Sequence, residues 1–575
     1  MSKQDSDRTE SDHTISRRKF LGNTALGSAA LLSGGLASLL SRSASAAAES
    51  FQIAEASIPE LEAAMASGEV TSRALVEYYL RRIEALNPLL HSVIQTNSNA
   101  ICMANQLDHE RVNGHIRGPL HGIPVLVKDN IATGPEVCEG TTNIMETTAG
   151  SLALVGSRVP GDATIISHLR AAGAVILGKT NLGEWANFRG NDNVYPLAVG
   201  WSARGGDTKN AYDLSYTSWG SSSGSANGVA ANLCSVAVGT ETDGSITGPS
   251  AVENIVGLKP TLGLVSPYGI IPISHQQDTA GPMARSVTDA AILLGVLQSP
   301  WGEVLGIHVP TDYTQFLQRG SLQGARIGRD IRYFDYRYFG SGIPGDEETV
   351  VFANNALIEM ESLGATIVDC DTGDVFAYTD DEFTALLYEF KAQIADYLAK
   401  LTDTNMRTLA DLIAFNNAHC REELVYYGQE IFEMAQQTIG YPTNPAYIAA
   451  RTHARRAARA GIDNAIRSQN LDAIVAPHLT NSTGPAVAGY PNLSLPAAIR
   501  QSGRPAGILM YSTFLREPRL LGLAYDLEQQ IHVRRQPRLL GSVIPIPNAG
   551  LCNDQPRQPQ LFTGTANAPL HGRIF

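Results

Sequence analysis

The hydrophobic positions of the chain follow two periods in turn, and this alternation predicts helices and short buried strands. Apolar residues recur at helical spacing within 61–65 and again within 75–86, which predicts two helices packed on a core, the second ending at Pro88. Short apolar runs follow between further helical stretches, at residues 123–127, 174–177, 236–238, around Ile327, and at 366–368, 473–476 and 508–511. Such runs are typical of strands buried on both faces. We therefore expect an α/β fold with a large mixed, mostly parallel central sheet that is covered by helices on both faces.

Three segments depart from this alternation. Residues 201–228 are rich in Gly and Ser, and we interpret them as a functional loop because apolar elements continue directly on both sides. Residues 378–447 are helical and amphipathic without strand patterns, which fits a helical cap over the site. Residues 548–575 are rich in Pro, Asn, Gln and Gly and lack periodicity, so a poorly ordered or loosely docked tail is expected.

The N-terminus has the pattern of an export signal. The letters SRRKFL at 16–21 precede a run of small and apolar residues up to position 40, and ASA at 44–46 is a plausible cleavage site. Glycines and serines interrupt the apolar run, which suits a transient signal better than a retained membrane anchor. We expect residues 1–48 to be a twin-arginine signal peptide read by the twin-arginine export machinery, and 49–547 to be one catalytic domain that is periplasmic or secreted, without a stable membrane span after processing.

Charge and cysteine content narrow the possible partners. The formal net charge of -13 and the pI near 5.5 argue against nucleic acid, which is bound mainly through Lys and Arg, and favour a small neutral substrate. The six cysteines have no paired short spacing of the kind found in zinc sites, so no structural metal and no cofactor are expected. Twin-arginine cargo is exported after folding, and we therefore expect a fold without disulfides.

Two serine-rich segments carry candidate chemistry. The first, at 219–226, reads WGSSSGSA, and alone it is more typical of a flexible loop or a phosphate-binding loop. The second, at 239–246, reads GTETDGSI, follows an apolar run, and places Ser245 after a glycine at a tight turn. Pro249 suits the first turn of a helix beyond it. Backbone N–H groups at such a turn can stabilise a developing oxyanion.

A serine nucleophile needs a base, and the sequence offers a lysine rather than a histidine. Neither serine-rich segment contains a histidine, and His121 and His275 have no carboxylate in an evident orienting position. Lys128 ends the apolar strand 123–127, and burial could lower its pKa enough to make it a neutral base. From its position alone, this side chain either extends to the surface or points into a site at the strand's carboxyl end.

Several motifs together resemble one enzyme family. Residues 122–130 (GIPVLVKDN) are similar to the lysine motif of the amidase signature family, and 220–225 (GSSSGS) with 239–245 (GTETDGS) are similar to its serine motifs. The two serines are 24 positions apart, since 245 minus 221 is 24, as in the family. Further matches are GKTN at 178–181, GLKPT at 257–261 and DTAGPM at 278–283. The similarity spans most of residues 57–535.

The resemblance implies a mechanism of amide hydrolysis. It makes Ser245 the nucleophile that forms an acyl-enzyme, Ser221 a proton relay in a cis peptide after Gly220, and Lys128 the base, while Ser222 and Gly220 support the loop. It assigns the oxyanion hole to four consecutive backbone N–H groups, those of Thr242, Asp243, Gly244 and Ser245. The implied fold is that of the amidase signature family.

Departures from the family pattern point to one branch. Asp243 stands where many members have glycine, and Thr247 where many have arginine. Residues 241–245, 184–190 and 271–283 are instead similar to bacterial peptide amidases, which remove ammonia from C-terminal peptide amides. An acidic residue beside the nucleophile could orient a substrate N–H or disfavour a free carboxylate; the alternative is a solvated turn residue.

Other interpretations stay open. The substrate could be a small aryl or aliphatic amide, the chain could resemble the amidase subunit of tRNA-dependent amidotransferases, or it could be an exported, non-catalytic amide- or peptide-binding protein. The match of 220–224 to the G-x-S-x-G motif of lipases is weak, because 214–218 is not an apolar strand. Lys179 and Lys259 are expected to be hydrogen-bonded structural residues. Aromatic residues could line a substrate groove or pack in the core, namely Trp185, Phe188, Tyr388, Phe390, Tyr426 and Tyr427.

Overall fold

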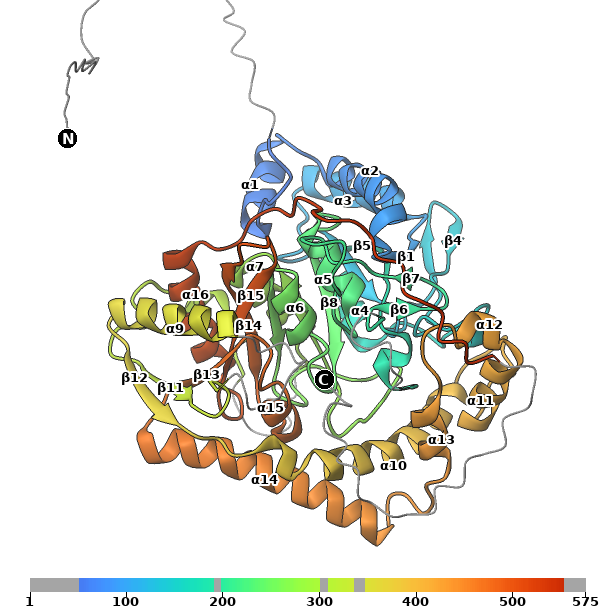
Figure 1. Ribbon diagram of the computed structural model, residues 1–575. Coiled ribbons are helices and arrows are strands. Elements are labelled where there is room, and N and C mark those ends of the chain that lie inside the picture. Colours follow the sequence, from blue (N-terminus) through green and yellow to red (C-terminus); the bar gives the residue numbers. More distant parts are fainter. Residues whose placement is uncertain (1–50, 191–197, 300–308, 336–346, 553–575) are drawn as a thin grey trace, which may run out of the picture. The chain divides into compact units, whose positions relative to one another are not determined.

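The protein is built around one large mixed sheet (Figure 1). The structure, a computed structural model, describes residues 51–190, 198–299, 309–335 and 347–552. The 11 strands of the sheet are, in spatial order, β1 (Val93–Thr96), β5 (Val175–Thr180), β2 (Pro124–Lys128), β8 (Val236–Glu241), β10 (Thr279–Ala284), β9 (Val256–Lys259), β14 (Asn492–Ile499), β15 (Pro505–Tyr511), β13 (Ala473–Pro477), β11 (Arg326–Asp330) and β12 (Thr366–Cys370). Two small ribbons pair β3 (Glu136–Cys138) with β4 (Thr141–Asn143), and β6 (Trp201–Ser202) with β7 (Gly206–Asp207).

The sheet is mixed, as expected, but the prediction that it is mostly parallel is wrong. Every predicted apolar run forms a strand of the sheet. Of its ten neighbouring pairs, four are parallel and six antiparallel. Five of these six pairs involve β1, β9, β10 or β14, which the sequence pattern did not predict. Glycine and proline, which are uncommon inside strands, weaken the strand pattern of three of these segments. β9 contains Gly257, β10 contains Gly281 and Pro282, and β14 contains Pro496.

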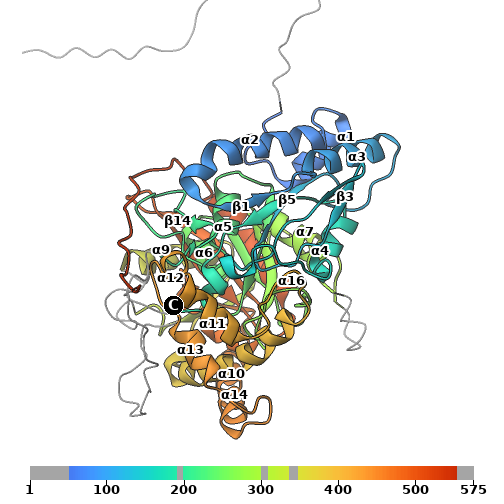
Figure 2. The same ribbon diagram turned by 90° about the vertical axis from the view of Figure 1, so that its right-hand side faces the viewer.

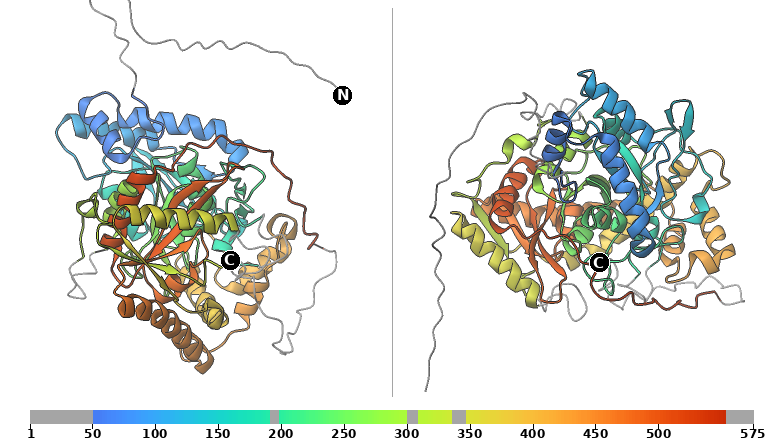
Figure 3. Two further views of the ribbon diagram at one scale, coloured as in Figure 1. Left: turned by 60° about the vertical axis from the view of Figure 1, so that its left-hand side comes forward. Right: turned by 90° about the horizontal axis from the view of Figure 1, so that it is seen from above.

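Alternate side chains of each strand enter cores on opposite faces of the sheet. Val125 and Val127 of β2 belong to one apolar cluster, while Leu126 belongs to another. The first cluster includes residues of α1 (Ile58–Ser67), α4 (Thr164–Ala171), α7 (Val287–Leu297), α9 (Glu347–Ser362) and α16 (Glu517–Ile531). The second includes residues of α2 (Ser72–Leu90), α3 (Ala100–Val112) and α5 (Ser223–Ala230). Figure 3 shows α9, in yellow, beside the red C-terminal strands that it contacts. Helices therefore cover both faces.

The segment predicted as a helical cap contains four helices, which share an apolar core with residues of 149–154, 185–188 and 271–273. They are α10 (Thr379–Leu398), α11 (Leu409–Ala418), α12 (Cys420–Glu423) and α13 (Glu430–Gln436), and α10 also packs against α14 (Pro445–Gln469). Figure 2 shows these helices gathered at the end of the molecule opposite α1, α2 and α3. Phe390 and Phe432 stack in their shared core with ring centroids 5.2 Å apart. The segment is therefore packed against loops of the remainder of the domain through this shared core.

Two disulfides correct the expectation of a fold without them. Cys102 pairs with Cys138 and Cys420 pairs with Cys552, while Cys234 and Cys370 are free and buried. The paired cysteines lie 36 and 132 residues apart along the chain, so no short spacing indicated them.

The second disulfide fixes the start of the predicted C-terminal tail. It joins the tail to α12, and Ala549 N donates a hydrogen bond to Val425 O at 2.8 Å. Residues 548–552 are therefore docked on the helical segment. The remainder of that tail, 553–575, and the predicted signal peptide, 1–48, lie outside the described residues. In the ranges that are described, no helix has both the length and the apolar character needed to cross a bilayer.

Candidate active site

Lys128 points into the protein rather than to its surface. It is the last residue of β2, whose neighbour β8 runs parallel, so the carboxyl ends of both strands meet at one edge of the sheet. The side chain is fully buried. Its Nζ lies 2.8 Å from Ser221 Oγ, 2.9 Å from Ser222 Oγ and 2.9 Å from Thr240 Oγ1. The two interpretations left open for this lysine are thereby resolved in favour of the internal site.

Burial makes this lysine a candidate neutral base. It lowers the pKa of Lys128 to about 7, because removing an ammonium ion from water is costly, although the carboxyl groups of Glu241 and Asp278 oppose that shift. In the described part of the chain, Lys128 forms no ion pair with either group. In a substantial fraction of the protein molecules, the Lys128 amine is therefore uncharged near neutral pH and can accept a proton.

The serine-rich loop is held between Lys128 and the second serine motif. The peptide bond between Gly220 and Ser221 is cis, as the family resemblance implied. Ser222 Oγ donates to Thr240 O at 3.0 Å and accepts from Thr240 N at 3.2 Å. Ser222 N donates to Ser245 O at 3.1 Å. Ser222 thus joins the two serine segments that are separate in the sequence.

The turn that carries Ser245 is fixed by a glycine conformation and by hydrogen bonds to the Glu241 carboxylate. Gly244 has a φ of 71°, a conformation that favours glycine, and a Cβ there would lie 3.1 Å from Ser482 Oγ. Glu241 Oε2 accepts hydrogen bonds from the backbone N–H groups of Ile246 and Thr247 at 2.8 and 2.9 Å. These contacts hold the start of α6 (Thr247–Val252), shortly after Ser245.

The predicted oxyanion hole has free donors. Among the described residues, no protein acceptor receives a hydrogen bond from the backbone N–H groups of Thr242, Asp243, Gly244 or Ser245. All four residues are half-buried and line a cavity. Unpaired N–H groups that face a cavity beside a serine can stabilise negative charge on a bound carbonyl oxygen.

The cavity is lined by both polar and apolar residues. Residues of the two serine segments and Ser482 are among its lining residues, and those of the segments include Gly220, Thr242, Asp243, Gly244 and Ser245. Its apolar lining residues include Phe188, Ile273, Phe383, Leu386, Ile431 and Leu479. Of the aromatic residues named from the sequence, Phe188 and Tyr427 line this cavity, whereas Trp185 and Phe390 pack in the core of the helical segment. Ser245 thus lines a cavity that also has several apolar side chains in its wall.

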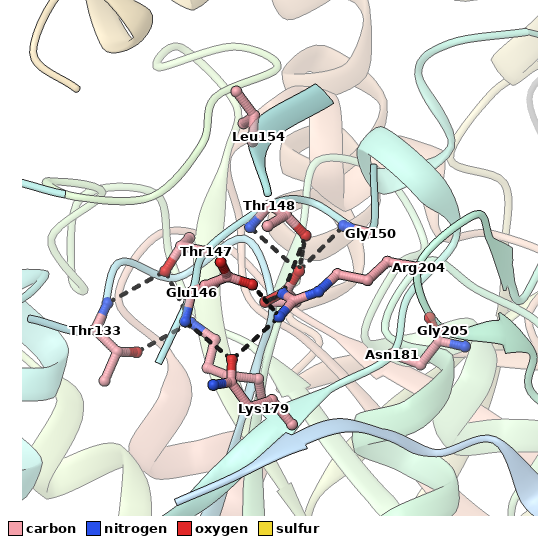
Figure 4. Close-up of polar contacts among 12 residues, drawn as sticks. Thr133, Glu146, Thr147, Thr148, Gly150, Leu154, Lys179, Asn181, Arg204 and Gly205 are labelled. Atoms are coloured by element: carbon pink, nitrogen blue, oxygen red, sulfur yellow. Dashed lines mark hydrogen bonds and ion pairs between the residues drawn. The ribbon is translucent and has the colours of Figure 1, made fainter. Parts of the chain in front are cut away.

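The other two buried lysines are structural, as predicted. Figure 4 shows Lys179 directed toward Thr133 and Thr147, whose Oγ1 atoms accept from its Nζ at 3.0 and 3.1 Å. Ile131 O is a third acceptor. Lys259 Nζ donates to Pro260 O at 3.1 Å. Within the described ranges, neither lysine is hydrogen-bonded to a serine of the site.

Three residues that contact the predicted site residues were missed in the sequence. Thr240 contacts Lys128 through Oγ1 and through its carbonyl oxygen, the latter at 3.2 Å. Its place inside the GTETDGS motif could have indicated a role. Ser482 and the neighbouring Thr483 donate to the carboxylate of Asp243 at 2.8 and 2.6 Å. No local motif marks them, because only the fold brings them beside the second serine segment.

Known proteins share both the sequence pattern and this fold. The profile of the family described as Amidase matches residues 74–486. A protein of Arabidopsis thaliana named "Probable amidase" is 39% identical over 85% of this chain and 93% of its own length. The native peptide amidase from Stenotrophomonas maltophilia is 46% identical, with a TM-score of 0.76 over 84% of this chain and 99% of that one. An amidase family protein from Bacillus anthracis is 32% identical, with a TM-score of 0.75 over 85% of this chain and 93% of that one.

Proposed function

We propose, on the premise that this chain belongs to the amidase signature family and hydrolyses carboxamide C–N bonds, that it removes ammonia from C-terminal peptide amides. In this proposal Ser245 is the nucleophile, Ser221 the proton relay and Lys128 the base. One observation carries the assignment of roles. A buried lysine whose pKa is lowered to about 7 contacts Ser221, in a loop that is hydrogen-bonded to Ser245 at the cavity wall.

The hydrogen bonds around Lys128 are compatible with proton transfer from Ser221 to a neutral amine. A neutral amine has two hydrogens and one lone pair. Ser222 gives its hydroxyl hydrogen to Thr240 O, so toward Lys128 it can only accept, and Thr240 O is itself an acceptor. Two amine hydrogens are therefore shared among Ser222 Oγ and the two oxygens of Thr240. In the proposed relay the lone pair accepts the hydroxyl hydrogen of Ser221, whose Oγ lies 2.8 Å from Nζ.

The reaction follows from this arrangement. Ser245 Oγ attacks the carbonyl carbon while its proton passes to Ser221, whose own proton passes to Lys128. The N–H groups of residues 242–245 stabilise the oxyanion of the tetrahedral intermediate. Lys128 then returns a proton through Ser221 to the leaving nitrogen, ammonia departs, and water hydrolyses the acyl-enzyme by the same proton route.

The shape of the cavity and the similarity to a peptide amidase support the substrate class. Apolar side chains beside the reactive serine suit an apolar C-terminal residue, and a solved relative is a peptide amidase. The test is ammonia release by the purified chain alone from C-terminally amidated peptides, aryl amides and aliphatic amides. Turnover of the peptide amides without tRNA or ATP is expected. If only aryl or aliphatic amides were hydrolysed, the substrate class would be these amides rather than peptide amides.

Activity should increase as the pH rises through about 7. The base must be uncharged, and the neutral fraction of Lys128 grows as the pH passes its lowered pKa of about 7. Below that pH, kcat/KM should fall close to tenfold for each further pH unit. The measurement is kcat/KM for one amide from about pH 5 to about pH 9; a flat profile over this range would contradict a lysine base.

We propose that the twin-arginine pattern at residues 16–21 directs export to the periplasm or medium. The two disulfides support an oxidising destination, because cytosolic thiols are kept reduced. The test compares the cell fractions that contain the full chain and a variant with Arg17→Lys and Arg18→Lys. Equal export of both would exclude the twin-arginine route.

A further inference from the structure

Asp243 is an acidic residue in the wall of the catalytic cavity. It lies two positions before Ser245 on the same turn and lines the same cavity. Its backbone N–H is one of the candidate oxyanion donors, but neither amide hydrolysis nor the proton relay requires its carboxylate. The proposed hydrolysis therefore gives the carboxylate of Asp243 no role.

Two hydroxyl groups fix the orientation of this carboxylate. Ser482 Oγ donates to Oδ1 at 2.8 Å and Thr483 Oγ1 donates to Oδ2 at 2.6 Å, where α15 (Thr483–Ala488) begins. A carboxylate oxygen can accept two hydrogen bonds. Each oxygen of Asp243 thus retains acceptor capacity while its position is held. A held acceptor beside the nucleophile suits recognition of a donor on the substrate.

The charges around Asp243 do not neutralise it. Within the ranges that the structure describes, Asp243 forms no ion pair. The charged groups that act on it are Glu241 on β8, Lys259 on β9 and Glu382 on α10. Glu382 is fully buried, and its Oε2 has no hydrogen-bond partner among the described residues. Asp243 therefore lines the cavity without a paired cation, and two further acidic residues lie behind it.

We propose that Asp243 makes the site selective for an unsubstituted carboxamide over the corresponding carboxylic acid. The carboxylate accepts an N–H of the substrate's terminal –NH2 group, and it repels the carboxylate of a free acid. The inference rests on the proposed function in one respect, namely that the leaving group is ammonia. Its consequence is that the reaction product is expelled, because hydrolysis converts the attractive –NH2 into a repelled oxygen anion.

Binding to an inactive enzyme tests this without turnover. In a Ser245→Ala background at about pH 8, calorimetry would compare a peptide amide with the same peptide as its free acid, with and without Asp243→Asn. Burial raises the pKa of Asp243 to about 7, which is still below the pH of this experiment, so its carboxyl group is mostly ionised. The preference for amide over acid should fall at least about tenfold in the Asn variant, a change typical of losing a charged hydrogen-bond partner.

A second variant and a second readout separate recognition from structure. Asp243→Gly removes the carboxylate and needs no additional space, so it should lose the same preference. In the enzyme with Ser245 intact, Asp243→Asn should lower kcat/KM for the primary amide about tenfold and for the methyl ester of the same acyl group less than about twofold, because the ester has no N–H. A merely structural role would lower both alike.

The outcomes distinguish the two proposals. An unchanged amide preference in both Asp243 variants, or equal losses on amide and ester, would overturn the role of Asp243. Absence of ammonia release from peptide amides would instead overturn the proposed substrate, and the binding comparison would then use an aryl amide and its acid.

Discussion

Ser245→Ala should leave a folded protein whose kcat for amides is at least about 10⁴-fold lower, since this change removes the only atom that forms a covalent bond to the substrate. The side chain lies at the cavity wall, so its loss should affect chemistry rather than packing. The measurement is ammonia release at saturating amide, with circular dichroism to verify the fold.

Ser223→Ala is a matched control in the other serine segment. Ser223 is buried, and its Oγ has no hydrogen-bond partner in the described part of the chain. Activity should remain within about twofold of the parent, since no interaction is lost. If Ser222→Ala abolished turnover while Ser245→Ala retained it, the nucleophile would instead be Ser222, as in the lipase motif.

Lys128→Met should lower kcat by about 10³-fold and change KM little. Methionine keeps the length and apolar character of the lysine stem, but it cannot accept a proton, and general-base catalysis contributes about 10²–10⁴-fold. Lys128→Arg should not restore activity, because arginine stays charged at all accessible pH values. Steady-state kinetics with one amide substrate provide both constants.

Lys179→Met controls for the loss of a buried lysine. Lys179 is fully buried on the strand next to β2, and burial lowers its pKa to about 8. Its removal leaves Thr133 and Thr147 without this donor, so the protein should be destabilised, while the activity per folded molecule should persist. If both lysine variants lost activity equally, the effect of Lys128→Met would be structural rather than catalytic.

Much of the sheet could be predicted from its apolar runs, but the direction of its strands could not. A run such as Val236–Val238 shows that a strand is buried on both faces, and this pattern is the same for parallel and antiparallel neighbours. Pairing partners depend on contacts between distant segments. β14, which contains Pro496, is an example, since it joins β9 to β15 in the centre of the sheet.

The predicted site residues could be identified from local motifs. The residues that contact and support them from distant segments belong to no such motif. Residues 122–130 and 239–245 each lie on one strand and its following turn, so short sequence patterns could indicate Lys128 and Ser245. Ser482 belongs to a segment far along the chain and contacts Asp243 only in the folded protein. The pairing of Cys420 with Cys552 likewise depends on docking of a remote segment.

The groups proposed to react all precede residue 246, while Phe383, Leu386 and Ile431 of the cavity wall come from α10 and α13. Chemistry and acyl-group selection can therefore diverge independently during evolution. Exchanging residues 379–436 between relatives offers a modular route to new specificities, because it leaves the lysine and both serines untouched.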